Sequence, residues 1–375
     1  MSDALAPPPI RVLRIYHSAV VTAWRRREAA LADEGVEVTL ISPRRWNEGG
    51  AMVDLDAGPD EDIIVVPTLG RHPFRFSAHP WSLFRALRAH RSIDVLDVHE
   101  EPAALATIET MLLARLAGCR APVVCYSAQN LLKRYPPPFR WFERWVLRRT
   151  AAIHTCNDDV AGVLRVKDYE GAVVDLGLGF DDESFRPATR PADRGTSFRL
   201  GYVGRFTEQK GVFTLVTALG MVEGVEADFI GAGPEEARLR KAIRTRGLSG
   251  RARVRGFVDH DELPSWYRSL DVLVVPSIDQ PNVREQFGRV IVEAMACGTP
   301  VIATDVGAFP DVAGDAAVIV PDGDARALAD AIERVRDQPE LRAQMSERGI
   351  ARAEEFSWRR IARRQAALYR QVVAR

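Results

Sequence analysis

The chain has 375 residues, a length that predicts two domains at roughly 100 to 200 residues each. Its 51 Lys and Arg balance 51 Asp and Glu, so the chain lacks the basic excess that a general nucleic-acid binder needs. Hydrophobic residues make up 46% and charged residues 27% of the chain, which excludes a disordered or fibrous protein.

Short β-branched runs alternate with amphipathic segments of helical length along the first half of the chain. This alternation predicts a parallel sheet whose strands are joined by crossover helices. The first expected helix, Thr22 to Asp33, stops before Gly35, a residue that suits the position after a helix. The expected strands are Val12 to Tyr16, Val36 to Ile41, Ile63 to Val66, Val95 to Val98, Val123 to Tyr126, Ala152 to Thr155 and Val173 to Leu176.

A polar stretch rich in Pro and Gly, residues 181–195, predicts an interdomain linker. The alternation then starts again, so we expect two tandem Rossmann-like doubly wound α/β domains, over residues 1–185 and 196–357. The strands expected in the second domain are Leu200 to Val203, Ala227 to Ile230, Val254 to Phe257, Val272 to Val275, Val301 to Ala303 and Val318 to Val320.

The loops beyond the carboxyl ends of the strands are where ligands bind in such sheets. The most informative loop lies between the strand ending at Val275 and a helix expected over residues 288–298. Glu285 lies in this loop and Glu293 in the helix, and either carboxylate could instead be a solvated charge. The helix start would offer unpaired amides to an anion such as phosphate, those of Phe287, Gly288 and Arg289.

Arg205 and Lys210 lie in another loop, after the first strand of the second domain. The guanidinium fork and the ammonium charge together suit a diphosphate, whereas two exposed cations without a ligand are the alternative. Lysine accounts for only four of the 51 basic residues, which makes a lysine at this place less ordinary. A third loop, Gly231 to Glu235, is expected to be a tight turn into a helix.

The combination of these motifs resembles glycosyltransferase family 4, whose members have the GT-B fold. Glu285 and Glu293 match the E-x7-E pattern of the retaining enzymes. The ending Phe356-Ser-Trp358 and the segment from Trp358 to Arg375 are similar to the terminal helix that returns to the first domain in this family. The other matching segments fall in the family's order: Gly204-Arg205, Lys210-Gly211, Gly231-x-Gly233-Pro, Gly256 to His260, Glu293 to Ile302 and Gly307.

The resemblance implies a cleft between the domains and transfer of a hexose from a nucleotide diphosphate sugar, UDP- or GDP-sugars first, to a hydroxyl acceptor. It also implies retention of configuration and no metal or other cofactor. In that picture Arg205 and Lys210 hold the diphosphate and Glu285 holds the donor sugar. The implied donor-binding residues are Glu293 at the ribose, Phe257 and Val258 at the base, and Phe287, Gly288, Arg289 and Gly204 around the phosphates and sugar.

The first domain departs from the family pattern in two loops. Many members have a Gly-Gly loop after the first strand, but residues 16–24 contain no glycine. Many also have a His where this chain has Gln129, which cannot act as a base at neutral pH but can form hydrogen bonds. Because the leaving diphosphate can lead the reaction, losing that His need not abolish transfer. The candidates on the acceptor side are His17, Gln129, Asn130 and Glu100.

His99 ends an expected strand and is followed by Glu100 and Glu101. We count His99 among the catalytic candidates, as a general base or acceptor anchor. The alternative is a satisfied structural histidine beside an acidic pair at a helix start. Adjacent residues converge poorly on one ion, so we expect no metal here. The segment Asp54-Leu-Asp56 is spaced like a metal-binding motif but is expected to be a solvated loop.

The segment from Met111 to Arg149 contains eight Lys or Arg and one Glu. Trp141, Trp145 and Arg148 are spaced along one helical face, which suits either an anionic membrane surface or acceptor, or core packing. The four cysteines have neither metal-site spacing nor disulfide density, and no stretch approaches the roughly 20 apolar residues of a membrane span. We therefore expect a cytoplasmic protein, either free or peripheral to the inner face of the membrane.

Two alternatives to a glycosyltransferase stay open at this point. A sugar-nucleotide epimerase or hydrolase of the same fold would turn over the donor without an acceptor. A non-catalytic subunit would bind the nucleotide sugar and form no product. For the transferase, the sequence predicts a nucleotide-sugar donor and an acceptor hydroxyl on a small molecule, a glycan or a lipid-linked sugar, and no nucleic-acid partner.

Overall fold

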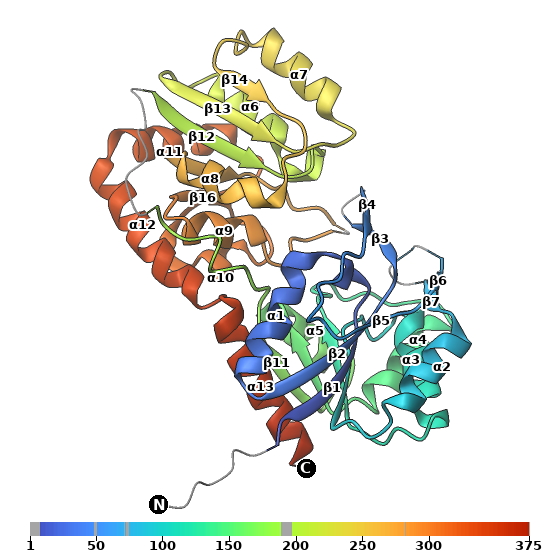
Figure 1. The fold of residues 1–375 in the computed structure, drawn as a ribbon. Helices are drawn as coiled ribbons and strands as arrows, with labels where there is room; N and C mark the ends of the chain where they lie inside the picture. The colour runs from blue at the N-terminus through green and yellow to red at the C-terminus, as the bar shows by residue number, and fades with distance from the viewer. Residues whose placement is uncertain are drawn as a thin grey trace, which may run out of the picture. The chain divides into compact units, whose positions relative to one another are not determined.

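The computed structural model describes residues 8–48, 51–70, 72, 75–188, 197–281 and 283–374. The chain folds into two compact units, which are coloured by residue number in Figure 1. Unit 1 comprises Met1–Gly179 and Trp358–Arg375, and unit 2 comprises Phe180–Ser357. The expected linker begins in unit 2, and its residues 189–195 lie outside the described residues.

Unit 1 is built on a seven-stranded parallel sheet of order β11-β10-β9-β8-β1-β2-β5. From β1 the chain adds β2 and β5 on one side, and it then adds β8 to β11 on the other side. The strand order therefore reverses between β1 and β8, which are parallel neighbours with Ile15 paired to Val98. The residues after these two strands therefore emerge side by side, as expected at the switch point of a doubly wound sheet. The strands are β1 (Ile10–Ile15), β2 (Val36–Ser42), β5 (Ile63–Val65), β8 (Val95–Val98), β9 (Val123–Ser127), β10 (Ala152–Thr155) and β11 (Ala172–Asp175).

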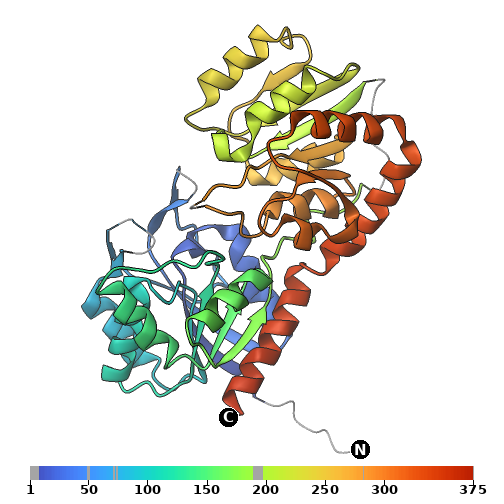
Figure 2. The same ribbon diagram turned by 180° about the vertical axis from the view of Figure 1, so that it is seen from behind.

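Helices cover both faces of the unit 1 sheet. On one face α2, α3 and α4 pack on alternate strand residues such as Leu13 and Leu96, and on the other α1 and α13 pack on Val12 and Val95. Figure 2 shows α13 from behind, beside the strands of this sheet. The helices are η1 (His17–Val20), α1 (Thr22–Asp33), α2 (Pro80–Ala89), α3 (Leu105–Leu116), α4 (Phe139–Leu147), α5 (Asp158–Val166) and α13 (Trp358–Val373).

Two short antiparallel pairs in unit 1 were not expected from the sequence. They are β3 (Arg45–Glu48) with β4 (Ala51–Asp54), and β6 (Thr68–Leu69) with β7 (Ser77–Ala78). Asp54 therefore ends a strand rather than lying in a loop, and its carboxylate pairs with Arg45 at 3.3 Å. Both side chains are exposed, so the prediction of a solvated carboxylate at this position is confirmed.

Unit 2 is built on a six-stranded parallel sheet of order β14-β13-β12-β15-β16-β17. The prediction of a strand from Val254 to Phe257 is wrong beyond Val254. Strand β14 ends there, and Phe257 is 78% exposed. The strands are β12 (Phe198–Val203), β13 (Val225–Ile230), β14 (Ala252–Val254), β15 (Val272–Val275), β16 (Val301–Thr304) and β17 (Ala317–Val320).

The helices of unit 2 complete its two outer layers. On one face α6, α7 and α11 share a core with β12 and β13. The start of α11 is fixed by Asp324, whose carboxylate accepts hydrogen bonds from the amides of Arg326 and Ala327, both at 2.9 Å. The helices are η2 (Glu208–Lys210), α6 (Val212–Leu219), α7 (Glu236–Thr245), η3 (His260–Glu262), α8 (Leu263–Arg268), α9 (Arg289–Ala296), α10 (Phe309–Ala313), η4 (Gly314–Ala316), α11 (Ala325–Asp337) and α12 (Pro339–Glu354).

All four cysteines are buried free thiols, as the sequence predicts. Within the described ranges, none of the helices combines the length and the apolar character that crossing a bilayer requires.

Candidate functional site

Two loops of unit 2 meet beyond the carboxyl ends of the neighbouring strands β12 and β15. Lys210, at the end of η2, places its Nζ 2.6 Å from Oε1 of Glu285. Ser277, two residues after β15, donates its hydroxyl hydrogen to the same oxygen at 2.9 Å. The amide of Ile278 donates to the carbonyl of Gln209 at 2.7 Å, so backbone atoms also join the loops. The structure thus brings together two of the predicted catalytic residues.

Glycines allow the close approach of these loops. Gly211 has φ +66°, and a Cβ built on it would lie 1.6 Å from the carbonyl oxygen of Pro276. Gly307 has φ +54°, and a Cβ there would lie 2.2 Å from the carbonyl oxygen of Glu285. A side chain at either position would separate the loop that bears Glu285 from its neighbours.

Helix α9 begins beside this ion pair. Among the described residues, the amides of Phe287 and Gly288 have no hydrogen-bond acceptor. Gly288 caps the helix at φ +83°, where a Cβ would lie 2.6 Å from the ring of Phe309. The backbone conformation and the packing against Phe309 therefore require glycine here, in addition to any requirement from a ligand. Phe287 itself is 2% exposed and packs on Phe356, so it can offer only its backbone to a ligand.

A cavity of about 180 Å³ lies at the start of α9. Sites for whole small molecules are typically about 300 to 1,000 Å³, so this cavity has room for only part of a nucleotide sugar. Its charged lining consists of one carboxylate and two cations, and it is completed by glycines and apolar side chains. The lining includes Lys210, Glu285, Arg289, Gly204, Gly288, Ser277 and Phe309.

The other predicted donor residues lie outside this cavity. Arg205 follows β12 in the same loop as Lys210, is exposed, and has no ion-pair partner among the residues that the structure describes. Phe257 is exposed and Val258 half-buried, in the loop after β14. Neither of these two side chains lines the cavity.

Glu293 lies inside α9 and is 3% exposed, so the solvated alternative for this carboxylate is wrong. The hydroxyl of Tyr267 donates to its Oε2 at 3.0 Å, and Nε2 of His260 lies 3.3 Å from its Oε1. Burial and the adjacent carboxylate raise the pKa of Tyr267 well above its ordinary value. Both oxygens of Glu293 thus have a partner in the free protein, and a ligand would have to share them.

In unit 1, His17 and Glu100 form a close pair at the switch point of the sheet. Nδ1 of His17 lies 2.6 Å from both carboxylate oxygens of Glu100, and the His17 amide donates to Oε1 at 2.9 Å. The imidazole packs against the rings of Trp46 and Phe76, at centroid distances of 4.7 and 5.4 Å. These two acceptor-side candidates are therefore held as one unit.

His99 does not join that pair. Its ring stacks on Tyr126 at a centroid distance of 4.3 Å and meets the edge of Tyr16 at the same distance. Burial and the nearby Arg27 guanidinium lower the pKa of His99 well below its ordinary value. A buried, neutral imidazole inside an aromatic stack fits the structural alternative better than the catalytic one, and we leave His99 out of the proposed catalytic set.

Gln129 and Asn130 are buried in the loop after β9. The Gln129 amide donates to the Leu131 carbonyl at 3.0 Å and its oxygen accepts from the Tyr135 hydroxyl at 3.3 Å. These contacts fix the course of the loop. Nearby, Glu101 accepts hydrogen bonds from the Ser127 hydroxyl and the Ala128 amide at 2.8 and 2.7 Å.

His99 also belongs to a group of potential metal donors whose members come from two parts of the sheet, and not only from adjacent positions in the sequence. Atoms of Asp97, His99 and His154, all buried, lie within 4.8 Å of one another. Asp97 is already paired with Arg14 at 2.8 Å, and Arg14 and Arg27 both lower the pKa of the two histidines. Two guanidinium groups beside the donors oppose a further cation, so we assign this cluster to the packing of unit 1.

Comparisons with known proteins decide the family. Residues 188–352 match the model described as glycosyl transferases group 1, and residues 18–175 match the glycosyl transferase 4-like domain. The 2-deoxystreptamine N-acetyl-D-glucosaminyltransferase of Streptomyces fradiae is 32% identical over 373 residues, which cover 85% of this chain and 86% of the relative. The chain belongs to glycosyltransferase family 4.

Two further comparisons place this glycosyltransferase among its relatives. The D-inositol 3-phosphate glycosyltransferase of Pseudarthrobacter chlorophenolicus is 33% identical over 377 residues, covering 90% of this chain and 86% of the relative. Anabaena HepE, solved in complex with UDP and glucose, superposes with a TM-score of 0.71 at 17% identity and covers 96% of this chain and all of HepE. That likeness identifies the fold of the glycosyltransferase as GT-B.

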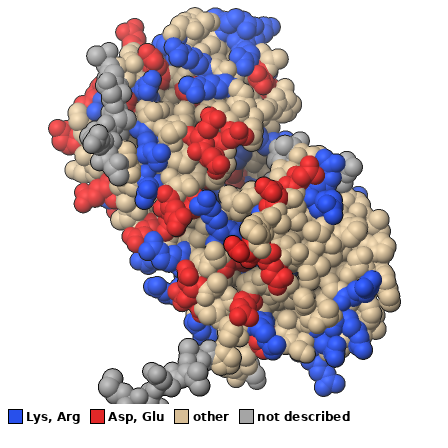
Figure 3. All heavy atoms as spheres, viewed as in Figure 1, with Lys and Arg blue, Asp and Glu red and all other residues tan. Residues whose placement is uncertain are grey.

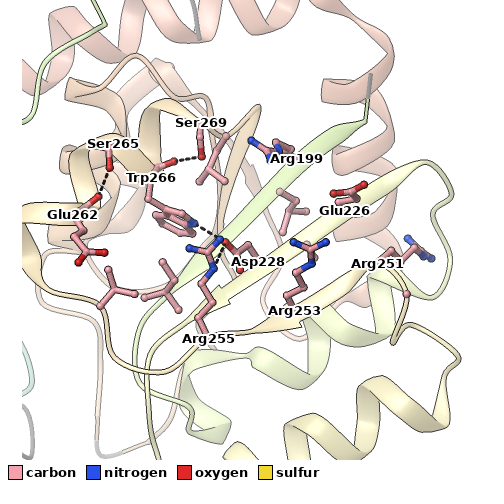
Figure 4. Close-up of a pocket in the computed structure, with 16 residues that line it drawn as sticks. Arg199, Glu226, Asp228, Arg251, Arg253, Arg255, Glu262, Ser265, Trp266 and Ser269 are labelled. Atoms are coloured by element: carbon pink, nitrogen blue, oxygen red, sulfur yellow. Dashed lines mark hydrogen bonds and ion pairs between the residues drawn. The ribbon is translucent and has the colours of Figure 1, made fainter. Parts of the chain in front are cut away.

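A second hollow of this glycosyltransferase, of about 260 Å³, lies on the sheet face formed by β12, β13 and β14 (Figure 4). Asp228 in its lining already has two partners: Arg255 contacts its carboxylate at 3.0 Å, and the Trp266 indole donates to the same carboxylate at 3.0 Å. Val258 lines its margin, so the predicted base-binding segment borders this hollow rather than the cavity at α9.

Sequence reasoning assigned no role to three side chains that hold the two glutamates of the glycosyltransferase. Ser277 could have been noticed, because it lies in the loop two residues after a buried strand. His260 was named only as part of the family pattern. Tyr267 gave no signal, because an aromatic residue on a short helix is usually core, and its contact with Glu293 spans 26 positions of the chain.

Proposed function

We propose that this glycosyltransferase transfers a hexose from a nucleotide diphosphate sugar to a hydroxyl acceptor, with retention of configuration and without a metal ion. The observation that supports this most directly is the Lys210–Glu285 pair beside the free amides at the start of α9. A cation and free amides suit a phosphate, and a carboxylate suits sugar hydroxyls. Both kinds of group line one small cavity.

The chemical need is to stabilise the negative charge that develops on the leaving diphosphate. The α9 amides are fixed in position before the reaction, the Lys210 ammonium lines the same cavity, and the exposed Arg205 guanidinium can add a bidentate contact. These groups supply the charge that a metal ion would otherwise provide. Lys210 would turn from Glu285 toward the phosphate, leaving the Glu285 carboxylate to accept hydrogen bonds from the sugar.

For the donor, UDP- and GDP-hexoses are the first choice, and the UDP and glucose bound by HepE favour UDP. For the acceptor, two relatives that cover most of the chain are named for 2-deoxystreptamine and D-inositol 3-phosphate, which are both six-membered cyclitols. A cyclitol hydroxyl is therefore the acceptor we propose. The His17–Glu100 pair is the group in unit 1 best suited to hydrogen-bond it.

The experiment is an assay of the full chain with UDP- and GDP-hexoses, with and without 2-deoxystreptamine or an inositol phosphate, in the presence of EDTA. The expected result is an acceptor-dependent glycoside whose anomeric proton coupling in NMR matches the configuration of the donor. A product of inverted configuration, or a rate that EDTA abolishes and Mg²⁺ restores, contradicts the proposal. Donor turnover that is independent of acceptor favours the epimerase or hydrolase, and binding without product favours the non-catalytic subunit.

A further inference from the structure

The outer surface of α3 and α4 in unit 1 combines exposed apolar side chains with arginines. On α3, Leu112 and Leu116 are 46% and 72% exposed, and Arg115 lies on the same side of the helix. On α4, Trp141 is 58% exposed and precedes Arg144 by one helical turn and Arg148 by two. Because α3 and α4 are adjacent, the two stripes form one surface, which we call the α3–α4 face. Its members are Leu112, Arg115, Leu116, Trp141, Arg144 and Arg148.

This part of unit 1 has a strong excess of positive charge, although the whole chain is neutral. Within residues 79–92 and 103–150 the two carboxylates both have partners: Glu143 is buried and bound by Lys167 at 2.6 Å, and the half-buried Glu109 accepts the Ala78 amide at 2.9 Å. Figure 3 shows basic side chains over α2 and α3, with the acidic side chains of unit 1 away from them. The exposed cations in these two stretches are Arg85, Arg88, Arg91, Arg115, Arg120, Lys133, Arg134, Arg140, Arg144, Arg148 and Arg149.

A pocket of about 620 Å³ opens where α3 and α4 end. Four arginines line it, Arg115, Arg120, Arg148 and Arg149, and its described lining contains no carboxylate. Arg115, Arg120 and Arg148 form no ion pair with any described residue. Free guanidinium groups around a pocket of this size suit a phosphate group, which they can bind through paired hydrogen bonds.

Structural roles account for only part of this arrangement. Arginines near the ends of α3 and α4 interact favourably with the helix dipoles, and Trp145 packs in the core and against Arg149. Neither role explains why Leu112, Leu116 and Trp141 remain exposed among cations. Nucleic acid would meet the positive charge but gives no use for exposed leucines. A lipid bilayer, which has phosphates at its surface and hydrocarbon below them, can interact with both the arginines and the apolar side chains.

We propose that the α3–α4 face docks this glycosyltransferase on a bilayer rich in anionic phospholipid, with a lipid phosphate in the arginine pocket. Trp141, Leu112 and Leu116 would enter the interface, where a tryptophan ring is well placed. The arginines would keep their guanidinium groups at the phosphates while their stems cover apolar surface. This proposal concerns unit 1 alone and does not depend on the identity of the donor or the acceptor.

The experiment is flotation of the full chain with vesicles of phosphatidylcholine, either alone or with 30% phosphatidylglycerol. We expect binding to the anionic vesicles only, reduced more than tenfold when salt is raised from 50 to 500 mM. The test variant is R144E/R148E on α4. The matched control is K241E/R244E on α7 of unit 2, which makes the same change of net charge at two exposed cations. We expect more than a tenfold loss of binding for the test variant and less than a twofold change for the control.

A second variant, L112S/L116S, removes apolar surface and leaves every charge in place. It should weaken binding at least threefold and should also weaken whatever binding remains at high salt. This variant decides the case if R144E/R148E does not keep the melting temperature of the parent chain. Equal loss in the test and control variants would mean attraction by bulk charge, and equal binding to neutral vesicles would mean a purely apolar contact. Either result, or binding to single-stranded oligonucleotides without binding to vesicles, overturns the proposal.

Discussion

Lys210 and Glu285, 75 positions apart in the chain, form an ion pair of 2.6 Å in the lining of the cavity beside α9. Each is thus the other's partner before any ligand arrives. A diphosphate that takes Lys210 must displace this pairing, and a sugar that binds Glu285 benefits when Lys210 turns away. In the proposed site, the pair would therefore link binding of the two halves of the donor.

Replacing Lys210 by Ala should reduce kcat/KM by about a hundredfold or more, because one cation at the proposed leaving-group site is lost. Because the buried Glu285 loses its ion-pair partner, the melting temperature should also fall, so activity is compared at a temperature where both proteins stay folded. Steady-state kinetics and a thermal melt give the two measurements. Lys241→Ala, at an exposed lysine on α7, is the matched control and should behave like the parent. Full activity of Lys210→Ala would remove this lysine from the site.

Replacing Glu285 by Gln should separate the sugar from the diphosphate. The amide keeps the size of the side chain but loses the charge, which frees Lys210 for phosphate. We expect the affinity for the bare nucleoside diphosphate to stay within a few-fold of the parent or to rise, while kcat falls by about a hundredfold. Calorimetric titration and turnover assays on the same sample test this. A parallel loss of nucleoside diphosphate affinity and kcat would contradict a role of Glu285 at the sugar.

The sequence predicted the strands of both sheets and the loops that carry Lys210 and Glu285, because buried parallel strands are short β-branched runs and their following loops are polar. It could not predict that the two side chains touch, because that contact depends on which strands are neighbours in the sheet. The hairpin of β3 and β4 was also missed, although Gly49-Gly50 between the two strands is a hairpin-turn signal, because neither flank is a β-branched run and the pair stands apart from the main sheet.

The charged network under α13 shows why buried polar residues are hard to predict. Arg14 and Asp97 lie on expected strands and are fully buried, although charged residues in a strand usually indicate an exposed face. They are tolerated because Tyr369 and Gln365 of α13 reach the same cluster from 268 or more positions along the chain. No local pattern in the sequence signals a partner at that distance.

Replacing Tyr267 by Phe should lower the free energy of unfolding by about 1 to 3 kcal/mol. The variant removes the hydroxyl that donates to Oε2 of Glu293 and leaves a buried carboxylate oxygen without that donor. Chemical denaturation measures the change. Adding Glu293→Gln to this variant should recover part of the loss, because a neutral amide costs less to bury than an unpaired carboxylate. An additive double-mutant cycle would contradict the proposed contact.

Replacing Tyr369 by Phe should also cost about 1 to 3 kcal/mol, because its hydroxyl is shared by three groups of the buried network. Arg14 and Gln365 donate to it at 2.7 and 2.8 Å, and it donates to Asp97. Tyr169→Phe is the comparison, since the contacts of the Tyr169 hydroxyl with the carbonyl oxygens of Thr150 and Ala172 are long, at 3.4 and 3.5 Å. Denaturation should show the larger loss for Tyr369→Phe, and the reverse order would argue against a fully formed network.

Glu101 should make the stability of the protein fall as pH rises through its titration. Removal from water raises its pKa to about 6 from an ordinary value of 4.5, despite the hydrogen bonds from Ser127 and Ala128. The folded protein then holds a proton between these two pH values that the unfolded chain has released. Stability from this group is therefore greatest below pH 4.5 and is lost by pH 6, a change of at most about 2 kcal/mol.

Glu101→Gln cannot titrate, so its stability relative to the parent should rise by up to that amount between pH 4 and pH 7. Urea denaturation across this range tests the sign, and a difference that stays constant or falls with pH would mean that the carboxyl is not desolvated as its contacts indicate.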